Sequence, residues 1–114
     1  MKKPTLLSAT ESSACSLLEP GQTVEQGIVS RAVLTTPTVR VTLFHFAAGQ
    51  ELSEHTSKAR ALVQILRGTC EFTTGKDVQT LKTGDLLHLP PGAPHAVTAT
   101  EAFSMLLTQL TEPA

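Results

Sequence analysis

The fold of this 114-residue chain is decided by the stretch Gly84-Asp85-Leu86-Leu87-His88-Leu89-Pro90-Pro91-Gly92-Ala93-Pro94-His95. Gly84 and Gly92 permit sharp bends of the backbone, and the residues 86–89 between them have the apolar content of a short strand. Pro90-Pro91 ends that strand, because proline cannot donate the hydrogen bond that a sheet requires. The stretch therefore predicts a strand, a turn and then a histidine, His95, placed beside the turn.

An earlier block has a related arrangement. Gly49 is followed after five residues by His55, and Gly68 closes the block. Ser57 and Ala61 lie between them at fixed distances from His55. Each block is interpreted as a strand bounded by glycines, with a histidine near a turn, where an imidazole is well suited to proton exchange or metal binding.

From residue 23 onward the chain is expected to be one β domain. Short apolar and β-branched segments alternate with Gly and Pro turns, which is typical of a sandwich or barrel. Residues 53–64 lack the i, i+3, i+4 pattern of a helix over the whole window. Residues 1–22 are rich in Ser, Thr, Glu and Pro and are expected to form an arm whose leucines can dock on the domain of residues 23–114. The predicted strands are 27–36, 39–46, 61–66, 70–73, 78–81, 86–89, 95–98 and 103–110.

The two blocks together resemble the paired motifs of the cupin superfamily, over about Val39 to Leu110. The first cupin motif reads Gly, five residues, His, one, His, three or four, Glu, six, Gly. The second reads Gly, five, Pro, one, Gly, two, His, three, Asn. This chain keeps every glycine, the proline and the spacing. The resemblance implies an all-β fold, the cupin-type double-stranded β-helix, which is a jelly-roll barrel. Within the superfamily, the chain resembles the small single-domain RmlC-like cupins, which are commonly dimeric.

The departures from the motifs bear on function. Cupin enzymes usually bind one divalent metal through His, His and Glu of the first motif and His of the second. His55 and His95 match the first and last of these ligands, whereas Ser57 replaces the second histidine and Ala61 replaces the glutamate. Ala99 replaces the asparagine of the second motif. Two imidazoles would hold a metal weakly, because a catalytic site normally has at least three protein ligands.

Two further histidines are candidates for completing such a site. If Phe44 and its alternate neighbours face the core, as in small cupins, His45 points outward; with the opposite parity it points inward and becomes a possible metal ligand. His88 alternates with Leu87 and Leu89, the pair expected to face the core, so a surface position is favoured for it.

Strand parity also predicts the character of the barrel interior. Ala61, Val63 and Ile65 share the strand face on which the glutamate of the family points into the barrel. This wall of the barrel would therefore be apolar, which favours an apolar ligand cavity over a charged metal site. The predicted ligand-binding residues are His55, Ser57, Ala61, Val63, Ile65 and His95.

The leading hypothesis is a cupin that binds a small organic molecule in its barrel, with at most a weak or incomplete metal site at His55 and His95. The alternative is a metal-dependent enzyme of the dioxygenase or isomerase type, in which these two histidines and one further ligand hold Zn, Fe, Mn or Ni. The resemblance does not identify catalytic residues, a substrate or an enzymatic activity, because a fold alone specifies no reaction.

Composition narrows the partners and the compartment. Nine basic and ten acidic residues give a net charge of -1, which provides no general attraction to nucleic acid or to an anionic membrane. The two cysteines, Cys15 and Cys70, form no paired motif and are expected to be free thiols in a reducing compartment. No signal peptide or membrane-spanning run is predicted, so a cytoplasmic location is expected.

A homodimer is the expected assembly. The strand 39–46 is apolar at both parities, and Leu62 and Leu66 stand opposite the inward positions of their own strand. Such strands are buried on both faces, and a second copy related by a two-fold axis is the simplest cover. The leucines of the arm are a competing cover. A third hypothesis follows, a non-catalytic structural or regulatory protein that pairs through this exposed sheet face.

Overall fold

The computed structural model describes residues 4–18 and 25–112, and all regular secondary structure in them is β-strand. No helix that could cross a membrane occurs in these two ranges. The strands are β1 (Ile28–Thr35), β2 (Val39–Phe46), β3 (Glu51–His55), β4 (Arg60–Arg67), β5 (Thr69–Thr74), β6 (Asp77–Lys82), β7 (Leu86–Leu89), β8 (His95–Thr98) and β9 (Phe103–Leu110).

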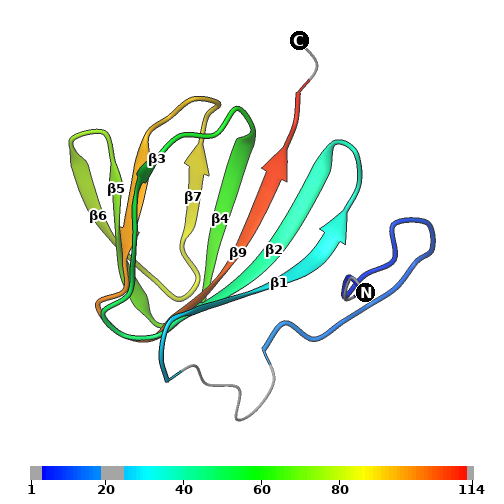
Figure 1. Cartoon of the computed structure of the whole chain (residues 1–114), viewed down its shortest axis with the longest axis horizontal. Coiled ribbons are helices and arrows are strands. Elements are labelled where there is room, and N and C mark those ends of the chain that lie inside the picture. The colour runs from blue at the N-terminus through cyan, green and yellow to red at the C-terminus, as the bar shows by residue number, and fades with distance from the viewer. Residues whose placement is uncertain (1–3, 19–24, 113–114) are drawn as a thin grey trace.

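The strands form two antiparallel sheets that face each other (Figure 1). One sheet has the order β1-β2-β9-β4-β7, and the other has the order β3-β8-β5-β6. Several neighbouring strands are distant in sequence, as β2-β9 and β3-β8 illustrate, which is the crossover pattern of a jelly roll. The all-β jelly-roll architecture predicted from the sequence is confirmed.

One end of the barrel is closed by aromatic packing. Phe46 at the end of β2 pairs with Phe103 at the start of β9, and their rings stack with centroids 4.6 Å apart. Gly68 makes the turn beside them, with a φ of +85°. A Cβ at Gly68 would lie 2.3 Å from the carbonyl oxygen of Ala102, so the backbone approaches too closely there for any side chain.

The opposite end of the barrel is the open one. The β1–β2, β3–β4 and β7–β8 turns gather there with the last residues of β9, at the top of Figure 1. Along the inner face of the five-stranded sheet, composition changes from polar at this end to aromatic at the other. Successive inward rows across β2, β9 and β4 are Arg40–Gln109–Ala61, Thr42–Leu107–Val63 and Phe44–Met105–Ile65.

The eight predicted strands lie within one residue of observed ones, and one strand was missed. β3 was not predicted because only Leu52 in the segment ELSEH is apolar. It is an edge strand, hydrogen-bonded to β8 alone, so most of its side chains are exposed and need no apolar pattern.

The described part of the arm lies against β1. The amides of Leu6 and Leu7 donate to the carbonyl oxygens of Ala32 and Val33, at 3.2 and 2.8 Å. Val33 is buried at 3% exposure, as expected for a residue beneath a covering segment. The predicted boundary between arm and domain at residues 22 and 23 lies outside the described residues.

Candidate functional site

His55 and His95 lie side by side at the open end of the barrel. They are direct cross-strand partners where β3 pairs with β8, although 39 other residues separate them in the sequence. The ring centroids are 4.1 Å apart, with an angle of 62° between the ring planes. Phe72 of β5 lies against His95 with its ring nearly parallel, at a centroid distance of 6.2 Å. Strand pairing and aromatic packing therefore hold the two imidazoles together.

Main-chain hydrogen bonds fix the tautomer of both rings. His55 Nδ1 lies 2.9 Å from the carbonyl oxygen of Ser53, and His95 Nδ1 lies 3.0 Å from that of Ala93. A carbonyl oxygen only accepts, so each Nδ1 carries the hydrogen. In the neutral rings both Nε2 atoms then hold lone pairs that are available to a ligand's hydrogen-bond donor or to a cation.

Two cavities adjoin the pair. An inner cavity of about 90 Å³ lies within the barrel, and its remaining wall is apolar. A smaller one of about 70 Å³ lies toward the open end. Both are lined by His55, Leu89, His95 and Leu107, so the pair stands between them. The inner cavity is completed by Phe44, Leu52, Val63, Phe72, Val97 and Met105, and the outer one by Ser57, Ala59, Ala61, Pro90, Ala93 and Gln109.

Most of the predicted binding residues adjoin these cavities. Ser57 and Ala61 line the outer cavity, and Val63 lines the inner one. Ile65 requires a correction, because it lines neither of these cavities. It lies one row deeper, opposite Met105, and is 1% exposed in the packed core.

The donor set around the pair does not fit a catalytic metal centre. Ala61 has no donor atom, and the Ser57 hydroxyl accepts a hydrogen bond from the Ala59 amide at 3.2 Å. In residues 4–18 and 25–112, no group of three His, Cys, Asp or Glu side chains is placed to hold a metal ion. Two imidazole nitrogens are fewer than the three protein ligands of such a site.

His45 is not brought to the pair. Phe44 and Phe46 face the core, so His45 lies on the outer face of the five-stranded sheet, opposite Ser104 of β9. Its Nδ1 is hydrogen-bonded to the Ser104 hydroxyl at 2.6 Å, and its Nε2 is buried without a partner in the described structure. Burial, together with the charge of Arg67, lowers the pKa of His45. The role of His45 as a third metal ligand is therefore corrected to that of an outer-face residue beneath the arm.

His88 lies on the outer face, as predicted. It is opposite Leu62 of β4, and its Nε2 lies 2.8 Å from a guanidinium nitrogen of Arg60. Arg60 also forms an ion pair with Glu112, and this hydrogen bond lowers the pKa of Glu112. The guanidinium group of Arg60 is therefore held by two side chains of its own chain.

The buried thiol has no chemical role at this site. Cys70 is fully buried in the core, and burial raises its pKa to about 11. A thiol in this state is almost entirely protonated at neutral pH and is a poor nucleophile. Cys15, in the arm, is exposed.

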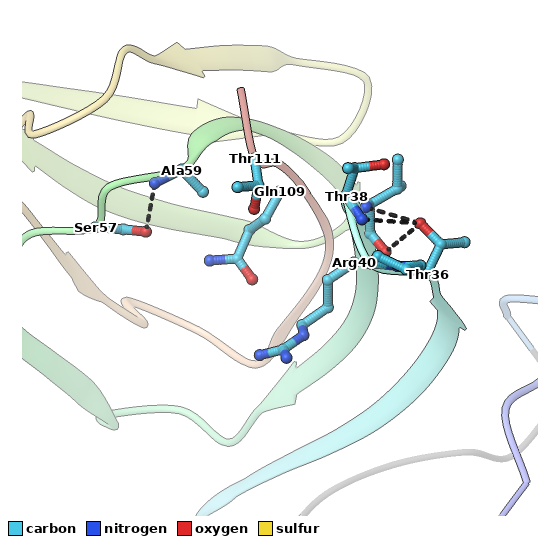
Figure 2. A pocket seen from close by; sticks show the side chains of 9 residues that line it. Thr36, Thr38, Arg40, Ser57, Ala59, Gln109 and Thr111 are labelled. Carbon is cyan, nitrogen blue, oxygen red and sulfur yellow. Dashed lines mark hydrogen bonds between the residues drawn. The ribbon is translucent and has the colours of Figure 1, made fainter. Parts of the chain in front are cut away.

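Two polar residues at the mouth were missed from the sequence. Arg40 and Gln109 are cross-strand partners, and Gln109 is also the partner of Ala61. A hollow of about 220 Å³ lies beside them, between the β1–β2 turn and the β3–β4 loop. Figure 2 shows Gln109 between Arg40 on one side and Ser57 and Ala59 on the other. The sequence signal for Arg40 was its position on the same face of the strand as Phe44, which predicts that it points inward.

Comparison with solved structures supports the same architecture. A conserved protein of unknown function from Streptococcus pyogenes is 28% identical, with 98% of each chain covered and a TM-score of 0.82. An RmlC-like cupin from Desulfovibrio desulfuricans is 28% identical over 89% of this chain and 98% of its own, with a TM-score of 0.78. A cupin superfamily protein from Desulfitobacterium hafniense is 28% identical over 80% and 84%, with a TM-score of 0.76.

Sequence comparison gives the family directly. No curated protein matches the chain. The family model described as the cupin domain matches residues 42–108, which include both glycine–histidine blocks. The match covers more than half of the chain, and the fold, the paired histidines and the similar structures agree with it. The chain belongs to the cupin family.

Proposed function

We propose that this cupin binds a small organic molecule at the open end of its barrel, with His55 and His95 as the central polar groups. The observation that carries the proposal is the position of the pair between two cavities, with both Nδ1 atoms satisfied and both Nε2 atoms free. A concave, mostly apolar site with a few convergent polar groups is the usual form of a small-molecule pocket.

The lining favours an organic ligand over a metal ion. Ser57 and Ala61 supply no replacement for the two metal ligands of other cupins, and the inner cavity is lined by aliphatic and aromatic side chains. An apolar group can therefore enter the inner cavity while a hydrogen-bond donor on the same molecule binds Nε2 of either ring.

Loss of both imidazoles tests this proposal. Fragments that bind the wild-type protein are identified by ligand-observed NMR and titrated into the double variant His55→Ala, His95→Ala. We expect the variant to remain folded and to lose binding, while the outer-face control His88→Ala binds as the wild type does. Equal binding by the wild type and the folded double variant would contradict a role for the pair. Unfolding of the double variant would show a structural role, and the functional proposal would be withdrawn.

We also propose that the chain forms a homodimer through the outer face of the five-stranded sheet. Leu86 of β7 is 65% exposed, and Leu62 and Leu106 are only half-buried on the same face. The described arm residues contact β1 and leave this part of the sheet uncovered. Light scattering should give twice the 12.1 kDa of one chain, and Leu86→Lys should lower that mass. A mass near 12.1 kDa for the wild type would refute the dimer.

A further inference from the structure

We propose that the ligand is a small organic acid, with its carboxylate held by Arg40 and Gln109 and its apolar part in the inner cavity. This inference rests on the proposed binding at His55 and His95 and adds the chemical class of the ligand. It arises from a polar row at the mouth that the cupin motifs do not contain.

Strand register places the row on the inner face. Arg40 of β2 is opposite Gln109 of β9, and Gln109 is opposite Ala61 of β4. Directly paired residues in an antiparallel sheet project from the same face. Ala61 is buried and lines the outer cavity beside the histidines, so all three residues belong to the inward face.

The mouth hollow is continuous in its lining with the cavities around the histidines. Ser57, Ala59 and Gln109 line both the hollow of about 220 Å³ and the outer cavity of about 70 Å³. The outer cavity in turn shares His55 and His95 with the inner cavity. A single molecule can therefore contact Gln109, the imidazole pair and the apolar interior in sequence.

The charge at the mouth favours an anion. Arg40 forms no ion pair within the described residues, where the recorded ion pair is that between Arg60 and Glu112. Its cross-strand neighbours, Thr35 and Gln109, are neutral. The guanidinium group is thus left with its positive charge beside the hollow.

A carboxylate matches this arrangement. Guanidinium groups bind carboxylates through two parallel hydrogen bonds, and the amide nitrogen of Gln109 can donate a further one. Figure 2 shows both side chains extending to the same side of the hollow. Phe44, in the inner cavity, lies four positions after Arg40 on β2, which corresponds to about 13 Å of strand. Long side chains at the mouth shorten that span, so hexanoate and 3-phenylpropanoate are suitable probes.

The test compares each acid with its neutral amide by isothermal titration calorimetry, at low ionic strength. We expect the wild type to bind hexanoate and 3-phenylpropanoate about tenfold or more tightly than hexanamide and 3-phenylpropanamide. Arg40→Gln should remove this preference, because it lowers the affinity for the acids far more than the affinity for the amides. Arg67→Gln, which removes an exposed arginine near the closed end of the barrel, should keep the preference.

The outcomes separate this inference from the proposed function. Equal affinity of acids and amides for the wild type, or a preference that survives Arg40→Gln, overturns the carboxylate inference. If the amides still bind and need His55 and His95, the proposed function stands without it. Failure of both acids to bind the wild type also overturns the carboxylate inference, and the fragment test with the double histidine variant then decides the proposed function separately.

Discussion

The imidazole rings of His55 and His95 stand 4.1 Å apart, and each directs its Nδ1 to a main-chain carbonyl two residues before it in the sequence. Cross-strand pairing alone would bring the two residues together, but the carbonyl contacts also decide which nitrogen is free. The pair therefore presents two acceptors to the cavities when both rings are neutral.

Nitrogen-15 NMR of the imidazoles tests this tautomer assignment. In their neutral form, both rings should show a protonated Nδ1 and an unprotonated Nε2 in long-range proton–nitrogen spectra. His88 Nε2 accepts from the Arg60 guanidinium, so His88 should show the same tautomer and serves as a positive reference on the outer face. A protonated Nε2 on either member of the pair would contradict the assignment.

Restoring the missing ligands should create a metal site. Ser57 and Ala61 line the same cavity as the two histidines, so Ser57→His with Ala61→Glu would place four nitrogen and oxygen ligands around it. We expect the double variant to bind Zn or Mn at one per chain, at least about a hundredfold more tightly than the wild type. Equilibrium dialysis measures both affinities.

Two controls accompany that measurement. Ser57→His alone tests a three-ligand site without introducing a buried carboxylate, and thermal unfolding verifies that each variant is folded. Equal metal uptake by the folded double variant and the wild type would mean that residues 57 and 61 do not correspond to the ligand positions of other cupins.

Two motif glycines should differ in their tolerance of alanine. Gly68 and Gly92 both have positive φ, at +85° and +81°. A Cβ at Gly92 meets nothing within 4 Å, whereas one at Gly68 meets the backbone of Ala102 and Phe103. Gly92→Ala should cost about 1–2 kcal/mol of unfolding free energy from backbone strain alone, and Gly68→Ala should cost more. Chemical denaturation measures both, and equal losses would contradict the close approach at Gly68.

His45 should make stability depend on pH. Its pKa is lowered in the folded state, so below the ordinary value of 6.5 the unfolded chain binds a proton that the folded chain resists. Stability is therefore retained above about pH 6.5 and falls as the pH decreases toward the folded pKa. Comparing denaturation midpoints between pH 8 and 5 should show a smaller decline for His45→Gln than for wild type. His88→Gln serves as the control, and identical slopes for His45→Gln and wild type would rule out this contribution.

The fold could be predicted from the sequence because proline and glycine residues mark the turns between its strands. Pro90-Pro91 and the positive-φ glycines end strands by local chemistry, and β7 has the predicted bounds. β3 escaped detection because an edge strand needs little apolar content. The parity of β2 was ambiguous because the arm buries its outer face, so Leu43 is as well buried as Phe46.

The candidate site could be predicted only in part, because part of it depends on long-range register. His55 and His95 could be predicted because each lies at a characteristic spacing from the glycines of its block. Arg40 and Gln109 are 69 positions apart and meet only because β2 pairs with β9 in one particular register. Ile65 was wrongly placed in the cavity wall for a similar reason. Which inward residues line the cavity depends on which side chains from other strands fill the core.

The most direct test of the account is to follow all four imidazoles while a bound fragment is titrated. Chemical-shift mapping of the histidine rings should show His55 and His95 perturbed together, with the same dissociation constant, while His45 and His88 are unchanged. His45 and His88 lie on the outer face of the five-stranded sheet, so a chemical-shift change of their rings would indicate binding outside the barrel. Perturbation of His45 or His88 with no change at His55 and His95, for every fragment that binds, would contradict the assignment of this pair as the ligand site.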